Sequence, residues 1–67
     1  MLKPEELRQM TIQELREKER ELSEKLMGLR FQKATGELEN PAMLKTMRRD
    51  LARVKTILRE KELEEER

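Results

Sequence analysis

The 67-residue sequence contains no cysteine, histidine, tryptophan or tyrosine, and its only aromatic residue is Phe31. Without cysteine the chain can form neither a disulfide nor a thiolate metal site, and its composition fits a reducing compartment. Ser23 and Asp50 are the only residues of their types, so the usual nucleophiles and proton-transfer groups are scarce. Helical glutamates without histidine usually serve only as solubilising charge. We therefore predict a protein that is not an enzyme and that binds neither a metal nor a cofactor.

Long hydrophobic runs are also absent. No stretch of apolar residues approaches the length of about 20 residues that spans a bilayer. Where a secretory signal would have an apolar region, the N-terminus carries the charged residues Lys3, Glu5, Glu6 and Arg8. A helix lying on a membrane surface is a weak alternative, because its usual aromatic anchors are missing apart from Phe31. We expect a cytoplasmic protein with no membrane partner.

Charged residues make up 46% of the chain and hydrophobic residues 34%, so the apolar set can cover one stripe per element but cannot fill a globule. This profile is typical of long amphipathic helices or of disorder. Helices are favoured because the apolar residues recur with helical period and strong helix formers dominate. The fold class that we predict is all-α.

Local signals place a short N-terminal helical turn and a first long helix. Pro4, followed by two glutamates, is typical of a first helical turn. Thr11 and Glu14 form a capping-box pattern, which predicts that a long helix starts at about residue 11. Gly36 is suited to the left-handed conformation that ends helices, so this helix is predicted over about 11–35.

A second long helix follows a short loop. Asn40 and Pro41 have the pattern of an N-cap and a first helical position, which predicts a loop over 36–40 and a helix over about 41–62. So short a connection requires two long helices to lie side by side and antiparallel. We therefore expect residues 1–67 to form a single helical-hairpin domain that binds RNA, for reasons given below.

We call the apolar contact between the two helices the seam. Its residues are found by placing successive residues about 100° apart around each helix axis. One stripe consists of Leu15, Leu22, Leu26 and Leu29, and the facing stripe of Leu44, Met47, Leu51, Val54 and Leu58. Met43 and Ile57 widen the second stripe on one side, where they should receive the N-terminal segment with Leu7, Met10 and Ile12. Gly28 lies inside the first helix, where glycine is unfavourable. Either another segment approaches the backbone closely at this position, or the helix simply tolerates the glycine.

The net charge of +1 conceals an uneven distribution of charge. Residues 1–24 have net charge −2, residues 25–59 have net charge +6, and residues 60–67 have net charge −3. A neutral total with a basic middle indicates a local anion-binding surface rather than a uniformly cationic tail.

Cations gather on the sides of the helices that do not form the seam. Between residues 45 and 59 there are six basic residues and one acidic residue, whereas an inert surface mixes both signs. We predict that both helices present one outward surface that binds RNA phosphates, formed by Arg16, Arg20, Arg30, Lys45, Arg48, Arg49, Arg53, Lys55, Thr56 and Arg59. Met27 and Phe31 lie among arginines on the first helix, and we predict that they contact RNA or a protein partner.

These residues also resemble a known family, the large ribosomal subunit proteins called L-twenty-nine. The most specific part is the second-helix run, in which Asn40-Pro41 precedes Arg48-Arg49-Asp50-Leu51-Ala52-Arg53-Val54-Lys55-Thr56. The rest of the resemblance comes from Leu7, Thr11, Glu14, Leu15, Leu29-Arg30-Phe31 and Thr35-Gly36-Glu37-Leu38. The similarity covers almost the whole chain.

The resemblance implies a structural constituent of the large ribosomal subunit that binds large-subunit ribosomal RNA near the exit of the nascent-chain tunnel. It also implies contact with a neighbouring ribosomal protein, and with a nascent-chain chaperone or targeting factor. It puts Arg48, Arg49, Arg53, Lys55 and Thr56 on the RNA side. The alternative from another class is a coiled-coil protein adaptor, in which the leucine seam would serve homodimerisation.

Overall fold

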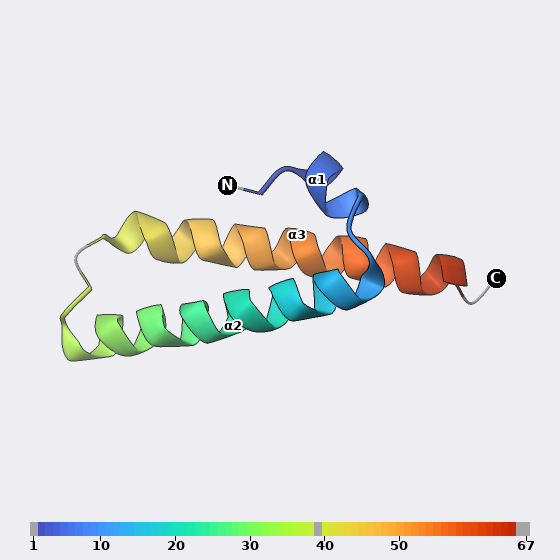
Figure 1. Cartoon of the computed structure of the whole chain (residues 1–67). Coiled ribbons are helices and arrows are strands. Elements are labelled where there is room, and N and C mark those ends of the chain that lie inside the picture. Colours follow the sequence, from blue (N-terminus) through green and yellow to red (C-terminus); the bar gives the residue numbers. More distant parts are fainter. Residues whose placement is uncertain (1, 39, 66–67) are drawn as a thin grey trace.

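The computed structural model describes residues 2–38 and 40–65, which form three helices joined by short connections. The helices are α1 (Pro4–Arg8), α2 (Ile12–Thr35) and α3 (Pro41–Glu65). Helices α2 and α3 lie side by side in opposite directions, and α1 packs on the side of α3 that faces away from α2 (Figure 1). The molecule is elongated, with a long dimension of 47 Å. The predicted all-α hairpin with a short N-terminal helical turn is confirmed.

The start of α2 is fixed by the capping residues that the sequence indicates. Thr11 is extended, and its hydroxyl oxygen accepts a hydrogen bond of 3.1 Å from the Glu14 backbone N–H. The same hydroxyl donates to the Glu14 carboxylate at 3.1 Å. A helix start has four N–H groups without a partner inside the helix, and Thr11 satisfies one of them.

The loop between α2 and α3 begins with a left-handed glycine. Gly36 has a φ of 79°, and the N–H of Glu37 returns to the Gln32 carbonyl at 2.8 Å. Asn40 then accepts a hydrogen bond of 3.1 Å from the Ala42 N–H, which caps the start of α3. Helix α3 continues to Glu65, three residues beyond the predicted end at 62.

The hydrophobic core is a single layer between α2 and α3 that widens where the N-terminal segment covers α3. In the described part of the chain it contains Leu7, Leu15, Leu22, Leu26, Leu44, Leu51, Val54, Ile57 and Leu58. Leu7, Leu15 and Val54 have no exposed surface, and all three lie in the half that α1 covers. Leu2, which the sequence analysis did not assign to the core, also packs against it.

One expectation about the seam is wrong, and one of the two explanations for Gly28 is excluded. Met43 does not receive the N-terminal segment: its side chain is 47% exposed, beside Leu29 and Gln32 at the loop end. In its described contacts the N-terminal segment reaches along α3 toward the loop only as far as Asp50, seven residues after Met43. Of the two explanations for Gly28, the close approach is excluded, because a Cβ at this position would have no neighbour within 4 Å.

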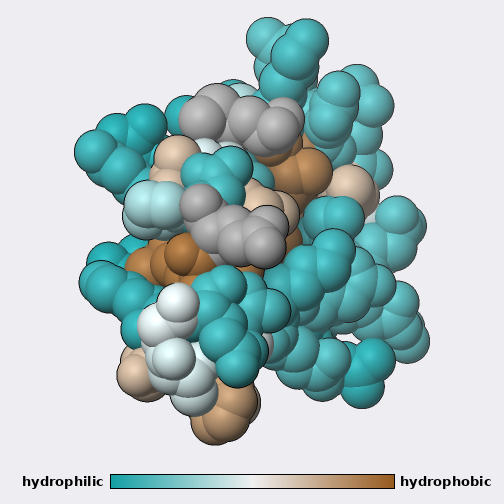
Figure 2. Space-filling view, turned by 90° about the vertical axis from the view of Figure 1, so that its left-hand side faces the viewer, coloured by the Kyte–Doolittle hydropathy of each residue, from teal (hydrophilic) through white to brown (hydrophobic). Residues whose placement is uncertain are grey.

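The loop end is therefore less completely packed than the other end. Figure 2 views the hairpin from this end and shows hydrophobic surface between hydrophilic side chains. At the opposite end the Lys61 ammonium group donates to the Met10 carbonyl, which ties the connection before α2 to α3. Across the residues described, no helix combines the length and the hydrophobicity needed to cross a membrane.

Candidate nucleic-acid interface

Helix α3 carries cations on two of its sides. Measured from Leu51 on the seam, Lys55, Arg48 and Arg59 are rotated by about 40°, 60° and 80°. On the same scale Lys45, Arg49 and Arg53 are rotated by about 120°, 160° and 200°. The first group borders the seam, whereas the second lies largely on the reverse of α3.

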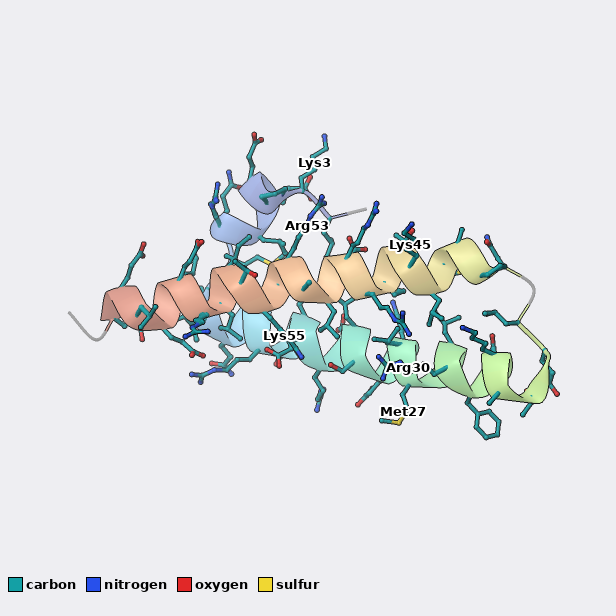
Figure 3. All side chains as sticks on the ribbon, turned by 180° about the vertical axis from the view of Figure 1, so that it is seen from behind. Lys3, Met27, Arg30, Lys45, Arg53 and Lys55 are labelled. Atoms are coloured by element: carbon teal, nitrogen blue, oxygen red, sulfur yellow. The ribbon has the colours of Figure 1, made fainter. Side chains whose placement is uncertain are left out.

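Helix α2 contributes cations to the first of these sides. Measured from Leu22 in the same sense, Arg30 and Arg16 are rotated by about 80° and 120°. Because α2 and α3 are antiparallel, equal rotations from the seam bring residues to the same side of the hairpin. Figure 3 shows Arg30 and Lys55 extending toward the space between the two ribbons. We call the surface formed by Arg30, Arg48, Lys55 and Arg59, with Arg16 at its margin where it pairs with Glu62 of α3, the shared face.

The remaining predicted cations lie elsewhere. Figure 3 shows Lys45 and Arg53 on the edge of α3 that faces α1, and Met27 on the far edge of α2. Lys45, Arg49 and Arg53 follow one another at intervals of four residues, so they form one row, which we call the α3 ridge. Arg20 is rotated by about 160° from Leu22, on the outer side of α2.

The prediction of one outward surface is therefore wrong in its geometry. The sides of two packed helices that are opposite the seam point away from each other, so they cannot form a continuous face. Only residues that border the seam can do so. The cations that were predicted to act together are divided between the shared face, the α3 ridge and the outer side of α2.

Few of these cations are neutralised by the chain's own carboxylates. Among residues 2–38 and 40–65, only Arg16 with Glu62 (3.4 Å) and Lys18 with Glu21 (4.0 Å) approach within ion-pair distance. The Arg16–Glu62 pair links α2 to α3, but both side chains are well exposed, so it contributes little to stability. Arg30, Arg48, Lys55 and Arg59 are exposed and have no ion pair with a described carboxylate. These four side chains are available to bind an anion.

Two of the predicted residues are partly occupied by bonds within the chain. Arg53 is half-buried and donates a hydrogen bond of 3.0 Å from Nη1 to the Leu2 carbonyl. The Thr56 hydroxyl donates to the Ala52 carbonyl at 2.9 Å, which leaves its oxygen as an acceptor only. Thr56 in this conformation cannot donate to a phosphate, whereas Arg53 has further N–H groups that can.

Asp50 has a role that was not predicted from the sequence. Its side chain is only 4% exposed, and its carboxylate accepts a hydrogen bond of 3.3 Å from the Leu2 backbone N–H. Asp50 and Arg53 lie three positions apart on one face of α3. Together they bind the backbone N–H and the backbone carbonyl of Leu2. The signal in the sequence was that Asp50 is the only acidic residue among the cations of residues 45–59. It lies beside the apolar stripe of α3, on the side that α1 covers.

Met27 and Phe31 are 70% and 69% exposed, which agrees with their expected place on the outer side of α2. Figure 3 shows Met27 directed away from α3, and Phe31 is rotated by about 180° from Leu22 on the seam. Both therefore lie apart from the shared face and the α3 ridge. In the described residues, no three histidine, cysteine or acidic side chains are placed to hold a metal ion.

A helical hairpin with a thin apolar seam and unpaired cations on its surface belongs to the class of small helical proteins suited to binding polyanions. Residues 5–61 match the family described as Ribosomal L29 protein. The chain therefore belongs to the Ribosomal L29 protein family, as its motifs indicated.

Several curated proteins are similar over nearly their whole length, and each bears the name large ribosomal subunit protein uL29. The protein from Natranaerobius thermophilus is 60% identical over 62 residues, covering 92% of this chain and 95% of its own. The protein from Moorella thermoacetica is 52% identical over 66 residues, covering 98% of both chains. The protein from Persephonella marina is 56% identical over 62 residues, covering 92% of this chain and 91% of its own.

Proposed function

We propose that this protein is a structural constituent of the large ribosomal subunit, that it binds large-subunit ribosomal RNA, and that it works in the cytoplasm as part of the ribosome. Its family and the names of its relatives support this function. It carries out no reaction: it contributes a rigid hairpin whose cations neutralise phosphates of folded RNA.

The shared face is the observation that carries the proposal. It combines exposed cations from both long helices, and Arg16 alone among them has a described carboxylate within ion-pair distance. The seam leucines fix the spacing of α2 and α3, so these cations are held in place before RNA arrives. Pre-placed cations lose less conformational freedom on binding than cations on a flexible segment do.

The position near the tunnel exit extends this proposal. Under it, the exposed Met27 and Phe31 contact a neighbouring ribosomal protein, because exposed aromatic and methionine side chains favour protein interfaces. A nascent-chain chaperone or targeting factor would dock on the same part of the subunit. The adaptor alternative gains no support, since the leucines it needs for dimerisation are buried within this chain.

Neutralisation of two cations on the shared face tests the proposal. In the double variant Arg48→Gln, Lys55→Gln, we expect weaker binding to purified large-subunit ribosomal RNA and a salt dependence reduced by about two units of slope. Both residues are exposed, so helicity by circular dichroism should be unchanged.

The matched control is the double variant Lys25→Gln, Lys33→Gln, which removes the same charge from exposed positions of α2 outside the predicted set. The control should bind nearly as well as the parent protein. Equal losses in the two variants would show that only net charge matters and would refute a role for the shared face.

A further inference from the structure

The N-terminal segment is held against α3 by its backbone. Asp50 accepts from the Leu2 N–H at 3.3 Å and Arg53 donates to the Leu2 carbonyl at 3.0 Å, while the Leu2 side chain packs on the core. Two hydrogen bonds to charged groups and an apolar anchor fix this residue. The next residue, Lys3, is therefore held beside α3 at the level of Arg53.

Lys3 consequently extends the α3 ridge. Figure 3 shows Lys3 on the same side of α3 as Arg53 and Lys45, with its side chain extending away from the helix. Residues four apart on a helix are separated by about 6 Å, so Lys45, Arg49 and Arg53 form a row that can follow a phosphate backbone. Lys3 is exposed and broadens the row at its Arg53 end.

The acids near this row are few and lie at its margin. Asp50 is buried and already accepts the Leu2 N–H, so it does not face the solvent beside the ridge. Glu60 lines the same groove as Arg53 and Arg8, but it is seven residues further along, about 10 Å down the helix axis. Glu5 and Glu6 are exposed on α1, next to Lys3 in the sequence. A phosphate backbone therefore fits best over the part of the ridge from Lys45 to Arg53.

The Arg53 end of the ridge and Lys55 of the shared face cannot hold the same phosphates. Lys55 and Arg53 are separated by about 160° around α3, and a helix with its side chains is about 10–12 Å across. A phosphate that contacts Lys55 therefore lies on the side of α3 opposite to Arg53. Two separate stretches of backbone are therefore needed to neutralise both Arg53 and Lys55.

We propose that Lys3 and the α3 ridge form a second phosphate-binding site, which takes an RNA segment different from the one on the shared face, and that Asp50 is the positioning residue that holds Lys3 there. This inference rests on the proposed function, because the ligand at both sites is RNA backbone. Helix α3 then lies between two RNA segments and holds them together.

Footprinting with hydroxyl radicals on purified large-subunit ribosomal RNA tests the inference. The ridge variant Lys3→Gln, Arg49→Gln should lose protection in one RNA segment, and the shared-face variant Arg48→Gln, Lys55→Gln in another. Each double variant should also weaken binding by on the order of tenfold. Loss of the same nucleotides in both variants, or an unchanged footprint for the ridge variant, would overturn the inference. A parent protein that protects no nucleotides would instead refute the proposed function itself.

The positioning role of Asp50 is tested by a measurement that a purely structural role would not change. Asp50→Ala should weaken the ridge footprint at the end nearest Lys3 while keeping the shared-face footprint, because the N-terminal segment is released but α2 and α3 remain packed. Asp50→Asn keeps a side-chain oxygen that can accept from the Leu2 N–H, so it should restore the ridge footprint. If Asp50→Ala does not fold, the ridge variant still decides the question, since Lys3 and Arg49 are exposed. A ridge footprint that is unchanged at the end nearest Lys3 in a folded Asp50→Ala variant would refute the positioning role.

Discussion

The two ends of the hairpin are built from the same kinds of residue but are packed differently. At the end that contains α1, three elements meet, and Leu7, Leu15 and Val54 are completely buried. At the loop end only α2 and α3 meet, so Leu29 is half-buried and Met43 is 47% exposed. Two helices alone bury one narrow stripe each, and a third element is needed to cover the sides of that stripe.

The same difference explains where polar groups are buried. The N-terminal segment brings the Leu2 peptide groups to Asp50 and Arg53, so a carboxylate can be 4% exposed and still have a partner. No described segment brings such partners to the loop end of α3, and its exposed side chains remain in water. A core extended by a short segment therefore depends on that segment for both its apolar and its polar contacts.

The largest expected effect comes from removing the anchor of α1. Leu7→Ala should lower the free energy of unfolding by about 2–5 kcal/mol, because a completely buried leucine leaves a cavity. Met43→Ala at the loop end should cost less than about 1 kcal/mol, since that side chain is half in water. Urea denaturation followed by circular dichroism measures both, and a missing cooperative transition for Leu7→Ala counts as a large loss. Similar losses for the two variants would contradict the difference between the two ends.

Gly36→Ala should have the next largest effect. Its φ of 79° lies in the left-handed region, where a side chain costs about 1–2 kcal/mol. Thermal melts should show reduced stability, and amide exchange should increase mainly around the loop. An unchanged melting temperature would mean that the end of α2 adopts another conformation.

Thr11→Ala tests the opposite end of α2. Loss of the hydrogen bond from the Glu14 N–H to the Thr11 hydroxyl should destabilise the protein by about 1 kcal/mol. Thr11→Ser retains the hydroxyl and is the control, so it should lie within about 0.5 kcal/mol of the parent. Equal destabilisation by alanine and serine would argue against the cap.

Gly28→Ala is expected to stabilise the protein slightly. The position is inside α2 and a new Cβ meets nothing within 4 Å, so alanine should gain about 0.5–1 kcal/mol. A higher midpoint in urea would show this gain. Destabilisation would instead show that the glycine is required for a contact made at the less packed end.

Most of the fold could be predicted because its signals are local. Thr11, Gly36 and Asn40 act through hydrogen bonds or dihedral angles within a few residues, and the structure has each of them in the expected role. The apolar stripes also follow from helical periodicity. The end of α3 was less certain, because no glycine or proline marks it and helix formers continue to Glu65.

The candidate site could be predicted only in part. Rotation about each helix axis separates cations from seam residues correctly, but it does not say how the sides of two different helices lie in space. Lys55 and Arg53 looked like neighbours in one cationic run, yet they point to opposite sides of α3. Lys3 and Asp50 gave no signal of a common role, because 47 positions separate them in the sequence.

By itself, then, the amino-acid order determined the helices, their caps, the seam and the excess of positive charge over residues 25–59. Tertiary structure alone decided which cations share a face, where the N-terminal segment lies on α3, and that Asp50 is buried. The physical reason is that helix formation depends on groups within about four residues of each other, whereas a binding surface depends on the packing of segments far apart in the chain.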